Sequence, residues 1–217
     1  MRAWINTAVS IPVILLLFFL PAGTFMYWQA WVLLTIVFVS SGITSRYFWR
    51  RDQGLIERRM RIRERDPGQR VVAILLYSLL AGLIVLAALD HRLHWSADLP
   101  ALAAFGDVLV IIGSYVYFIV LRENSFAGAT IDVAPDQRVI STGPYAVVRH
   151  PLYDGLLLFS IGIPLALGSY WALLLVLPIF ALIVARLTNE EKMLAKQLPG
   201  YSEYCAKVRW RLLPGLY

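Results

Sequence analysis

Charged residues are scarce in this sequence, and so is cysteine. Only 16% of the 217 residues are charged, while 59% are hydrophobic. Ordinary soluble domains have about 25% charged and roughly 45–50% hydrophobic residues, so a water-soluble globular protein is excluded. The single cysteine, Cys205, excludes an internal disulfide and a cysteine-based metal cluster. The basic residues do not surround a groove-reading element or a base-stacking platform, so we expect no nucleic-acid partner.

The hydrophobic residues gather in long blocks, which predicts an all-α integral membrane protein. The blocks cover residues 4–25, 27–49, 71–89, 101–121, 152–167 and 171–185. We interpret the first block as a membrane helix and not as a secretory signal, because no small-x-small cleavage site closes it. The last two blocks flank the turn Gly168-Ser169-Tyr170 and predict a C-terminal helical hairpin. We expect five or six transmembrane helices, with five if the first or the last pair does not fully cross.

The polar segments between the blocks predict the orientation in the membrane. The longest are a basic segment at residues 50–70, which carries eight arginines, the segment 122–149 and the tail 186–217. If these segments share one side with Arg2 and Arg46, nineteen of the twenty Lys and Arg residues lie there and only Arg92 lies opposite. The positive-inside rule assigns that side to the cytoplasm, and this bias explains the net charge of +6. The compact chain favours a bacterial inner membrane over the endoplasmic reticulum.

Two polar stretches at the cytoplasmic boundary are the main site candidates. The first covers residues 141–155, with the sequence STGPYAVVRHPLYDG. Pro151 suits the first position of a helix, which places His150 near the N-cap beside free backbone N–H groups. Such a helix end can hold a carboxylate. An interfacial helix start without a ligand explains the same residues, so both interpretations stay open on this stretch alone.

The second stretch, RLTNEEKML at residues 186–194, directly follows the last hydrophobic block. Arg186 and Glu190 are four residues apart and share one helical face, while Glu190 and Glu191 place two carboxylates at the membrane exit. A solvated helix face is the alternative interpretation. Because the hairpin returns the chain to the same side, Arg186 and His150 can be neighbours.

Together these stretches resemble the isoprenylcysteine carboxyl methyltransferase family and the related membrane phospholipid methyltransferases. The shared pattern is Gly-Pro-Tyr, Arg-His-Pro-x-Tyr-x-Gly, an apolar hairpin, Arg-x-x-x-Glu-Glu and Gly-Tyr-x-x-Tyr at residues 200–204, within about residues 125–214. The N-terminal blocks match this family only in being apolar. The resemblance implies that S-adenosylmethionine binds in a cytoplasmic pocket built by the C-terminal helices and loops. The sequence also lacks a strand followed by Gly-x-Gly, the fingerprint of a Rossmann domain.

The resemblance further implies a set of site residues. Contacts to the cofactor would come from Gln137, Arg138, Val139, Ile140, Tyr145, Arg149, His150, Pro151, Leu152, Tyr153, Glu190 and Glu191. Arg186 and Glu190 would be the catalytic residues, with Arg186 facing the acceptor. The family often has an amide near residue 130, where this chain offers Thr130 or Asp132.

The expected function is methyl transfer from S-adenosylmethionine to a lipophilic or lipidated acceptor that enters from the bilayer, with the carboxyl group of an isoprenylcysteine as the leading acceptor. N-methylation of a phospholipid amine and S-methylation of a small thiol are the enzymatic alternatives. A small transporter or assembly factor is the non-enzymatic one. Residues 1–121 would form the N-terminal helices, and residues 122–217 the methyltransferase region, of one membrane domain. We expect the basic segment to anchor to lipid headgroups, and lining of the cofactor mouth is the alternative. If the segment anchors, replacing Arg58 and Arg59 by Gln should leave cofactor affinity nearly unchanged.

Overall fold

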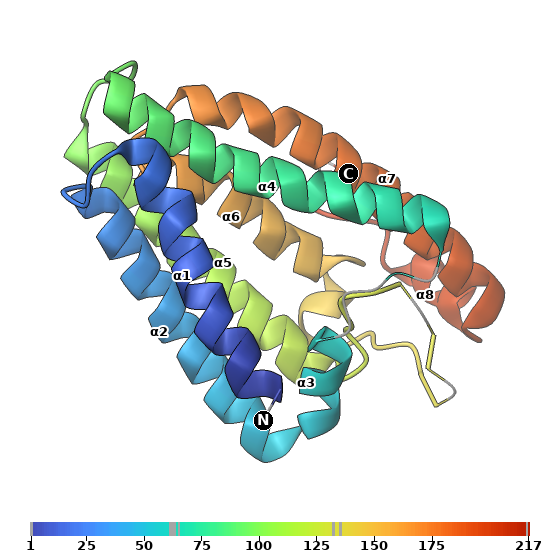
Figure 1. Ribbon diagram of the computed structural model, residues 1–217. Coiled ribbons are helices and arrows are strands. Elements are labelled where there is room, and N and C mark those ends of the chain that lie inside the picture. The colour runs from blue at the N-terminus through green and yellow to red at the C-terminus, as the bar shows by residue number, and fades with distance from the viewer. Residues whose placement is uncertain (1, 61–63, 65, 132, 135, 216) are drawn as a thin grey trace.

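The structure, a computed structural model, is all-helical, as the sequence predicts. It describes residues 2–60, 64, 66–131, 133, 134, 136–215 and 217, with side chains from residue 11 onward, and no strand occurs among them. Arg61, Arg63 and Arg65 of the basic segment and Asp132 lie outside the described residues. The elements in chain order (Figure 1) are α1 (Arg2–Ala22), α2 (Trp28–Arg51), α3 (Gln53–Met60), α4 (Pro67–Leu93), α5 (Pro100–Glu123), η1 (Gly143–Ala146), α6 (Pro151–Ala166), η2 (Trp171–Leu175), α7 (Val176–Gln197) and α8 (Tyr201–Lys207).

Four helical runs among the described residues are long and apolar enough to cross a membrane. They are α2, α4, α5 and the combined run of η2 and α7. Two shorter apolar helices accompany them, Ile11–Ala22 within α1 and Pro151–Ala166. Large hydrophobic side chains are exposed along the long runs, among them Val39, Ile43, Ile74, Ile111 and Leu177. Such a surface suits contact with lipid. The chain is a multi-pass integral membrane protein with four candidate spans.

Local sequence sets several of the helix ends. α4 starts at Pro67, where Asp66 caps the helix by accepting a hydrogen bond of 2.7 Å from the Gln69 backbone N–H. The last long helix continues to Gln197, well past the end of its hydrophobic block, because apolar residues mark the part that lies in lipid and not the end of the helix. The short helix α3 was not expected, since it lies in the basic segment and Leu55 is its only buried residue.

Glycine residues bring α5 and α6 into backbone contact. A Cβ at Gly106 would lie 2.2 Å from the Ala166 backbone nitrogen and 2.7 Å from the Gly162 carbonyl oxygen. Further along the pair, a Cβ at Gly113 would lie 3.2 Å from the Gly155 carbonyl oxygen. Small residues permit such close approach between membrane helices, where van der Waals packing drives association. This contact sets the position of α6, whose N-terminal end enters the candidate site.

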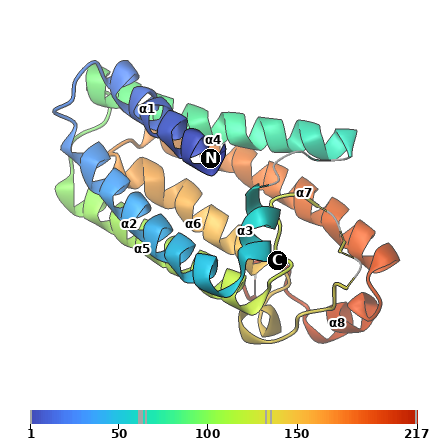
Figure 2. The same ribbon diagram turned by 60° about the horizontal axis from the view of Figure 1, so that its bottom comes forward.

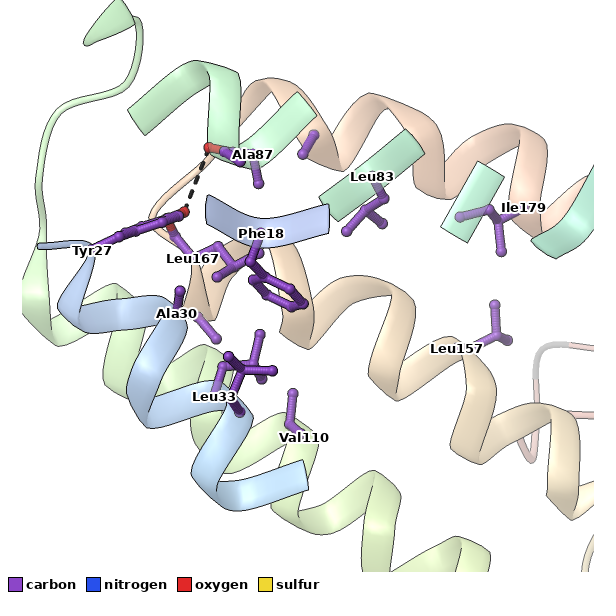
Figure 3. Close-up of a cluster of buried hydrophobic side chains, with 14 of the residues drawn as sticks. Phe18, Tyr27, Ala30, Leu33, Leu83, Ala87, Val110, Leu157, Leu167 and Ile179 are labelled. Carbon is purple, nitrogen blue, oxygen red and sulfur yellow. Dashed lines mark hydrogen bonds between the residues drawn. The ribbon is translucent and has the colours of Figure 1, made fainter. Parts of the chain in front are cut away.

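A polar network joins the turns at one end of the bundle. Asp90, near the end of α4, accepts hydrogen bonds from the hydroxyls of Ser96 at 2.6 Å and Ser169 at 2.5 Å. The Tyr27 hydroxyl donates to the Leu167 carbonyl at 2.6 Å. Figure 3 shows Tyr27 and Leu167 together at the edge of the hydrophobic core. The α1–α2, α4–α5 and α6–α7 turns therefore lie together.

The opposite end of the bundle collects the remaining elements. Figures 1 and 2 show α3, η1, α8 and the long segment after α5 gathered there. That segment, residues 124–142, has no helix or strand at its described positions. The helices α2, α5 and α7 end here, and α4 and α6 begin here. Side chains from both halves of the chain can therefore meet at this end.

Candidate active site

A cavity of about 340 Å³ lies at this end of the bundle. Its wall includes eleven of the predicted site residues: Gln137, Arg138, Val139, Ile140, Tyr145, Arg149, His150, Leu152, Tyr153, Arg186 and Glu190. Pro151 and Glu191 are the two predicted residues outside the wall. The two polar stretches, which the hairpin separates in sequence, therefore border one space.

The start of α6 is held by the C-terminal tail. The backbone N–H groups of Arg149 and His150 donate to the carbonyls of Trp210 and Arg211 at 2.9 and 3.0 Å. His150 is the N-cap residue of α6, yet its side chain makes no capping bond. Its Nε2 instead lies 3.2 Å from Glu191 Oε1. The first turn of α6 is thus fixed in place while its N–H groups have no side-chain cap.

Glu191 joins this helix start to α7 and to the tail. Its Oε1 lies 3.1 Å from Arg149 Nη1, and its Oε2 accepts a 2.9 Å hydrogen bond from Arg211 Nε. With His150, the carboxylate has three basic partners. Glu191 therefore links α6, α7 and the tail, and its predicted contact with the cofactor stays a prediction. Of the two adjacent carboxylates, Glu190 is the one on the cavity wall.

Glu190 and Tyr153 form a hydrogen-bonded pair on the wall, which links α7 to α6. The Tyr153 hydroxyl donates to Glu190 Oε2 at 2.8 Å. The other carboxylate oxygen of Glu190 accepts no hydrogen bond from the described residues. It remains available to a donor in the cavity.

Arg186 makes an ion pair that the helical spacing did not predict. Its Nη2 donates to Glu64 Oε1 and also to the Ala129 carbonyl, the latter at 3.1 Å. Glu190 shares the cavity wall with Arg186, but no ion pair joins them in the part of the chain that the structure describes. Glu64 lies 122 residues away in sequence, a separation over which helical spacing carries no information.

The basic segment contributes to the cavity as well. Arg58 Nε donates to the Ser125 carbonyl at 2.9 Å, and Arg59 Nη1 donates to the Gly128 carbonyl at 2.7 Å. Arg59 also lies over the Tyr117 ring, 5.2 Å from its centroid, and lines the cavity. Arg59 thus lies on the cavity wall, as the alternative to surface anchoring expects, whereas Arg58 does not line the cavity.

Tyr145 is anchored from two sides. Asn124 Nδ2 donates to its phenol oxygen at 2.9 Å, and the Tyr204 hydroxyl donates to its carbonyl at 2.7 Å. Burial raises the pKa of Tyr145 above its ordinary value, so the phenol stays neutral. Asn124, Thr130, Tyr201 and Tyr204 also line the cavity. Among these, Tyr201 and Tyr204 had a sequence signal, the Gly-Tyr-x-x-Tyr pattern that starts at Gly200, and Thr130 lies at the family position noted above. Asn124 had none.

Two kinds of side chain line the cavity. Polar ones come from residues 137–150 and from the end of α7, and apolar ones come from α4 and α6: Ala73, Leu76, Leu80, Leu156 and Phe159. The α4 residues belong to a candidate membrane span. The cavity volume lies within the range typical of small-molecule sites, roughly 300–1,000 Å³. The arrangement can hold a polar molecule beside the end of an apolar one.

Comparison with known proteins identifies two similarities. Residues 102–199 match the family model described as phospholipid methyltransferase. This range contains nearly all of α5 and the whole of α6 and α7. The chain is also 31% identical over 124 residues to the mouse Delta(14)-sterol reductase TM7SF2, a match that covers 51% of this chain but only 30% of the reductase. At a coarse level, the family match agrees with the resemblance that the motifs indicate.

Proposed function

We propose that this chain is an S-adenosylmethionine-dependent methyltransferase with a lipophilic acceptor. The observation that carries the proposal is the single cavity, where His150, Tyr153 and Glu190 border the same space as apolar side chains of membrane helices. The similarity of residues 102–199 to phospholipid methyltransferases supports the same chemistry. The polar cofactor would enter from water, and the acceptor from the bilayer.

The chemistry of the cavity residues fits this cofactor. Glu190 offers a carboxylate oxygen to a hydroxyl or amino group, and the Tyr201 hydroxyl is buried without a hydrogen-bond partner among the described residues. The start of α6 has no side-chain cap and suits a carboxylate, because the positive end of the helix dipole favours an anion there. The rings of Tyr145 and Tyr153 can pack against adenine or a sulfonium. When bound, the cofactor supplies an electrophilic methyl carbon.

The residues of the chain would act by positioning. Methyl transfer is an in-line displacement, so the protein has to align donor and acceptor and exclude water. The contacts of Glu191 with Arg149 and His150 keep the start of α6 in place. The apolar wall from α4 and α6 keeps water away from the acceptor. Little acid–base machinery is needed for a nucleophile that is already anionic.

A carboxylate is the acceptor group that we favour, with an isoprenylcysteine-like molecule as the leading case. Arg186 has a buried Nη1 without a hydrogen-bond partner among the described residues, and a guanidinium binds carboxylates well. A small thiol, as its thiolate, is also nucleophilic without a base. A phospholipid amine would have to react in its neutral form. These two remain the alternative acceptors, and a transporter or assembly factor remains the non-enzymatic alternative.

We further propose that the cavity end of the bundle faces the cytoplasm of a bacterial inner membrane. The excess of Lys and Arg in the segments that meet at this end supports that orientation. The shorter helices α1 and α6 would also lie in the bilayer, giving five or six crossings. Residues 1–121 and 122–217 would then act as one membrane domain.

A radiolabelled methyl-transfer assay on the detergent-purified chain tests the proposed function. The acceptors are N-acetyl-S-farnesylcysteine, phosphatidylethanolamine vesicles and benzenethiol. We expect transfer to the farnesylcysteine, because it joins a carboxylate to an apolar chain. Glu190→Gln should abolish transfer, since the cavity loses its free carboxylate.

Calorimetric titration with S-adenosylhomocysteine provides the matching binding measurement. Glu190→Gln should lose binding, whereas Glu203→Gln, on the exposed face of α8, should bind like the wild type. A folded wild-type chain that gives a flat titration contradicts the proposal and favours a non-catalytic role. Binding of NADPH instead would point to reduction, which needs a hydride donor.

A further inference from the structure

Glu64 is a buried carboxylate of the basic segment for which the proposed function gives no role. Its side chain is 2% exposed. Both carboxylate oxygens are engaged, because Oε1 accepts from Arg186 Nη2 and Oε2 accepts from the Ile131 backbone N–H at 3.1 Å. A buried carboxylate is costly unless it is paired and hydrogen-bonded. These two contacts therefore define what Glu64 does in the fold.

One guanidinium nitrogen of Arg186 makes no hydrogen bond to the described residues. Its Nη2 serves both Glu64 and the Ala129 carbonyl, whereas Nη1 is buried without a hydrogen-bond partner in the described part of the chain. Arg186 lines the cavity and Glu64 does not. Arginine–carboxylate pairs are frequently bidentate, with two nitrogens in a fork. Pairing through one nitrogen leaves Nη1 for an anion.

The backbone around Arg186 depends on the same carboxylate. Ala129 and Ile131, which bind Arg186 and Glu64 respectively, both line the cavity. Glu64 thus joins the segment after α5 to the guanidinium of α7. One side chain from the N-terminal half orients two parts of the cavity wall.

We infer that Glu64 is a positioning residue for the methyl acceptor. It holds the Arg186 guanidinium by Nη2 so that Nη1 is available to the acceptor's carboxylate. This inference rests on the proposed function and extends it to a residue outside the region that matches the phospholipid methyltransferases. Without Glu64 the long arginine side chain would gain rotamer freedom, and acceptor binding would have to order it again. Loss of Glu64 should therefore weaken the binding of the acceptor and not the binding of the cofactor.

Glu64→Gln tests the inference, because glutamine keeps the size of the side chain and removes its charge. We expect the KM for N-acetyl-S-farnesylcysteine to rise about tenfold or more, with kcat within about threefold. The Kd of S-adenosylhomocysteine should stay within about twofold. Glu57→Gln is the matched control, since Glu57 is an exposed carboxylate of the same segment. Glu64→Asp, which keeps the charge but shortens the reach, should give an intermediate KM and serves if the glutamine variant does not fold.

A double-mutant cycle separates positioning from general support of the fold. If Glu64 acts through Arg186, adding Glu64→Gln to Arg186→Gln should raise the acceptor KM no further. Additive effects would overturn the inference, as would an unchanged KM in Glu64→Gln or a joint loss of cofactor binding. Wild-type transfer only to phosphatidylethanolamine or to the thiol would overturn it while leaving the methyltransferase assignment intact. If the wild type neither binds S-adenosylhomocysteine nor methylates any acceptor, the proposed function fails first.

Discussion

Three side chains on the cavity wall carry a buried polar atom that lacks a protein partner. These atoms are Arg149 Nε, Arg186 Nη1 and the Tyr201 hydroxyl, out of seven such atoms among the described residues. Leaving a buried donor unpaired costs about 1–3 kcal/mol, so native proteins contain few of them. A polar ligand in the cavity would supply the missing partners. At the residue scale, these unpaired buried atoms are the physical reason to expect a polar ligand in the cavity.

A substitution at Tyr201 tests, without the acceptor, whether a ligand pairs with these buried polar atoms. Burial raises the pKa of Tyr201 above its ordinary value, so the hydroxyl is a neutral donor at pH 7. Tyr201→Phe removes an unpaired polar group, and the thermal unfolding midpoint of the ligand-free protein should stay the same or rise. The affinity for S-adenosylhomocysteine should fall about fivefold, which corresponds to one hydrogen bond of about 1 kcal/mol.

Tyr204→Phe is the control for that substitution. It removes the 2.7 Å bond to the Tyr145 carbonyl, so the unfolding midpoint should fall. If Tyr201→Phe lowers the midpoint and leaves the affinity unchanged, the hydroxyl has a structural partner and no ligand uses it.

The sequence predicts where candidate site residues lie on their helices when a local rule applies. Pro151 indicates the helix start, and the four-residue spacing places Arg186 and Glu190 on one face of α7. The partner of Arg186 could not be predicted in this way, because Glu64 reaches it only through the tertiary fold. The different surroundings of Glu190 and Glu191 likewise depend on α6 and the tail.

At the scale of elements, the contact between α5 and α6 positions the site. Gly106→Val should destabilise the protein by about 2 kcal/mol or more, because a Cβ there would lie 2.2 Å from the Ala166 backbone nitrogen. The helices would have to separate, and the start of α6 would move with them. We expect a lower thermal unfolding midpoint together with weaker binding of S-adenosylhomocysteine.

Gly42→Val is the matched control on α2. A Cβ at Gly42 would meet no described heavy atom within 4 Å, so the same change should leave both measurements nearly unaltered. Equal effects of the two substitutions would show that valine disturbs these helices by propensity or lipid contact and not through the α5–α6 interface.

Hydrophobic blocks predict most helices but only some of their ends. The blocks give the positions of α2, α4, α5 and α6 to within a few residues, since apolar side chains must match the bilayer. They give no sign of α3, and they stop short of the end of α7, because both segments lie among charged residues. The glycine contacts of α5 with α6 depend on how two helices cross, which composition does not specify.

At the scale of the whole molecule, the cavity is assembled from residues between Arg59 and Tyr204. Its wall draws on α3, α4, α5, the segment after α5, η1, α6, α7 and α8. The resemblance of the C-terminal region predicts the shared pocket of His150 and Glu190, whereas the contribution of Arg59 and of the α4 side chains follows only from the packed bundle. Of the elements before residue 124, α3, α4 and α5 therefore contribute to the cavity wall.

Ultraviolet cross-linking of radiolabelled S-adenosylmethionine in membrane vesicles tests the central claim most directly. We predict that label attaches to peptides from residues 137–153 and 186–204, only in vesicles with the cytoplasmic face outward, and that excess S-adenosylhomocysteine prevents it. Three results would contradict the claim. They are label on the turns at the other end of the bundle, label that the competitor does not displace, and equal labelling of right-side-out vesicles.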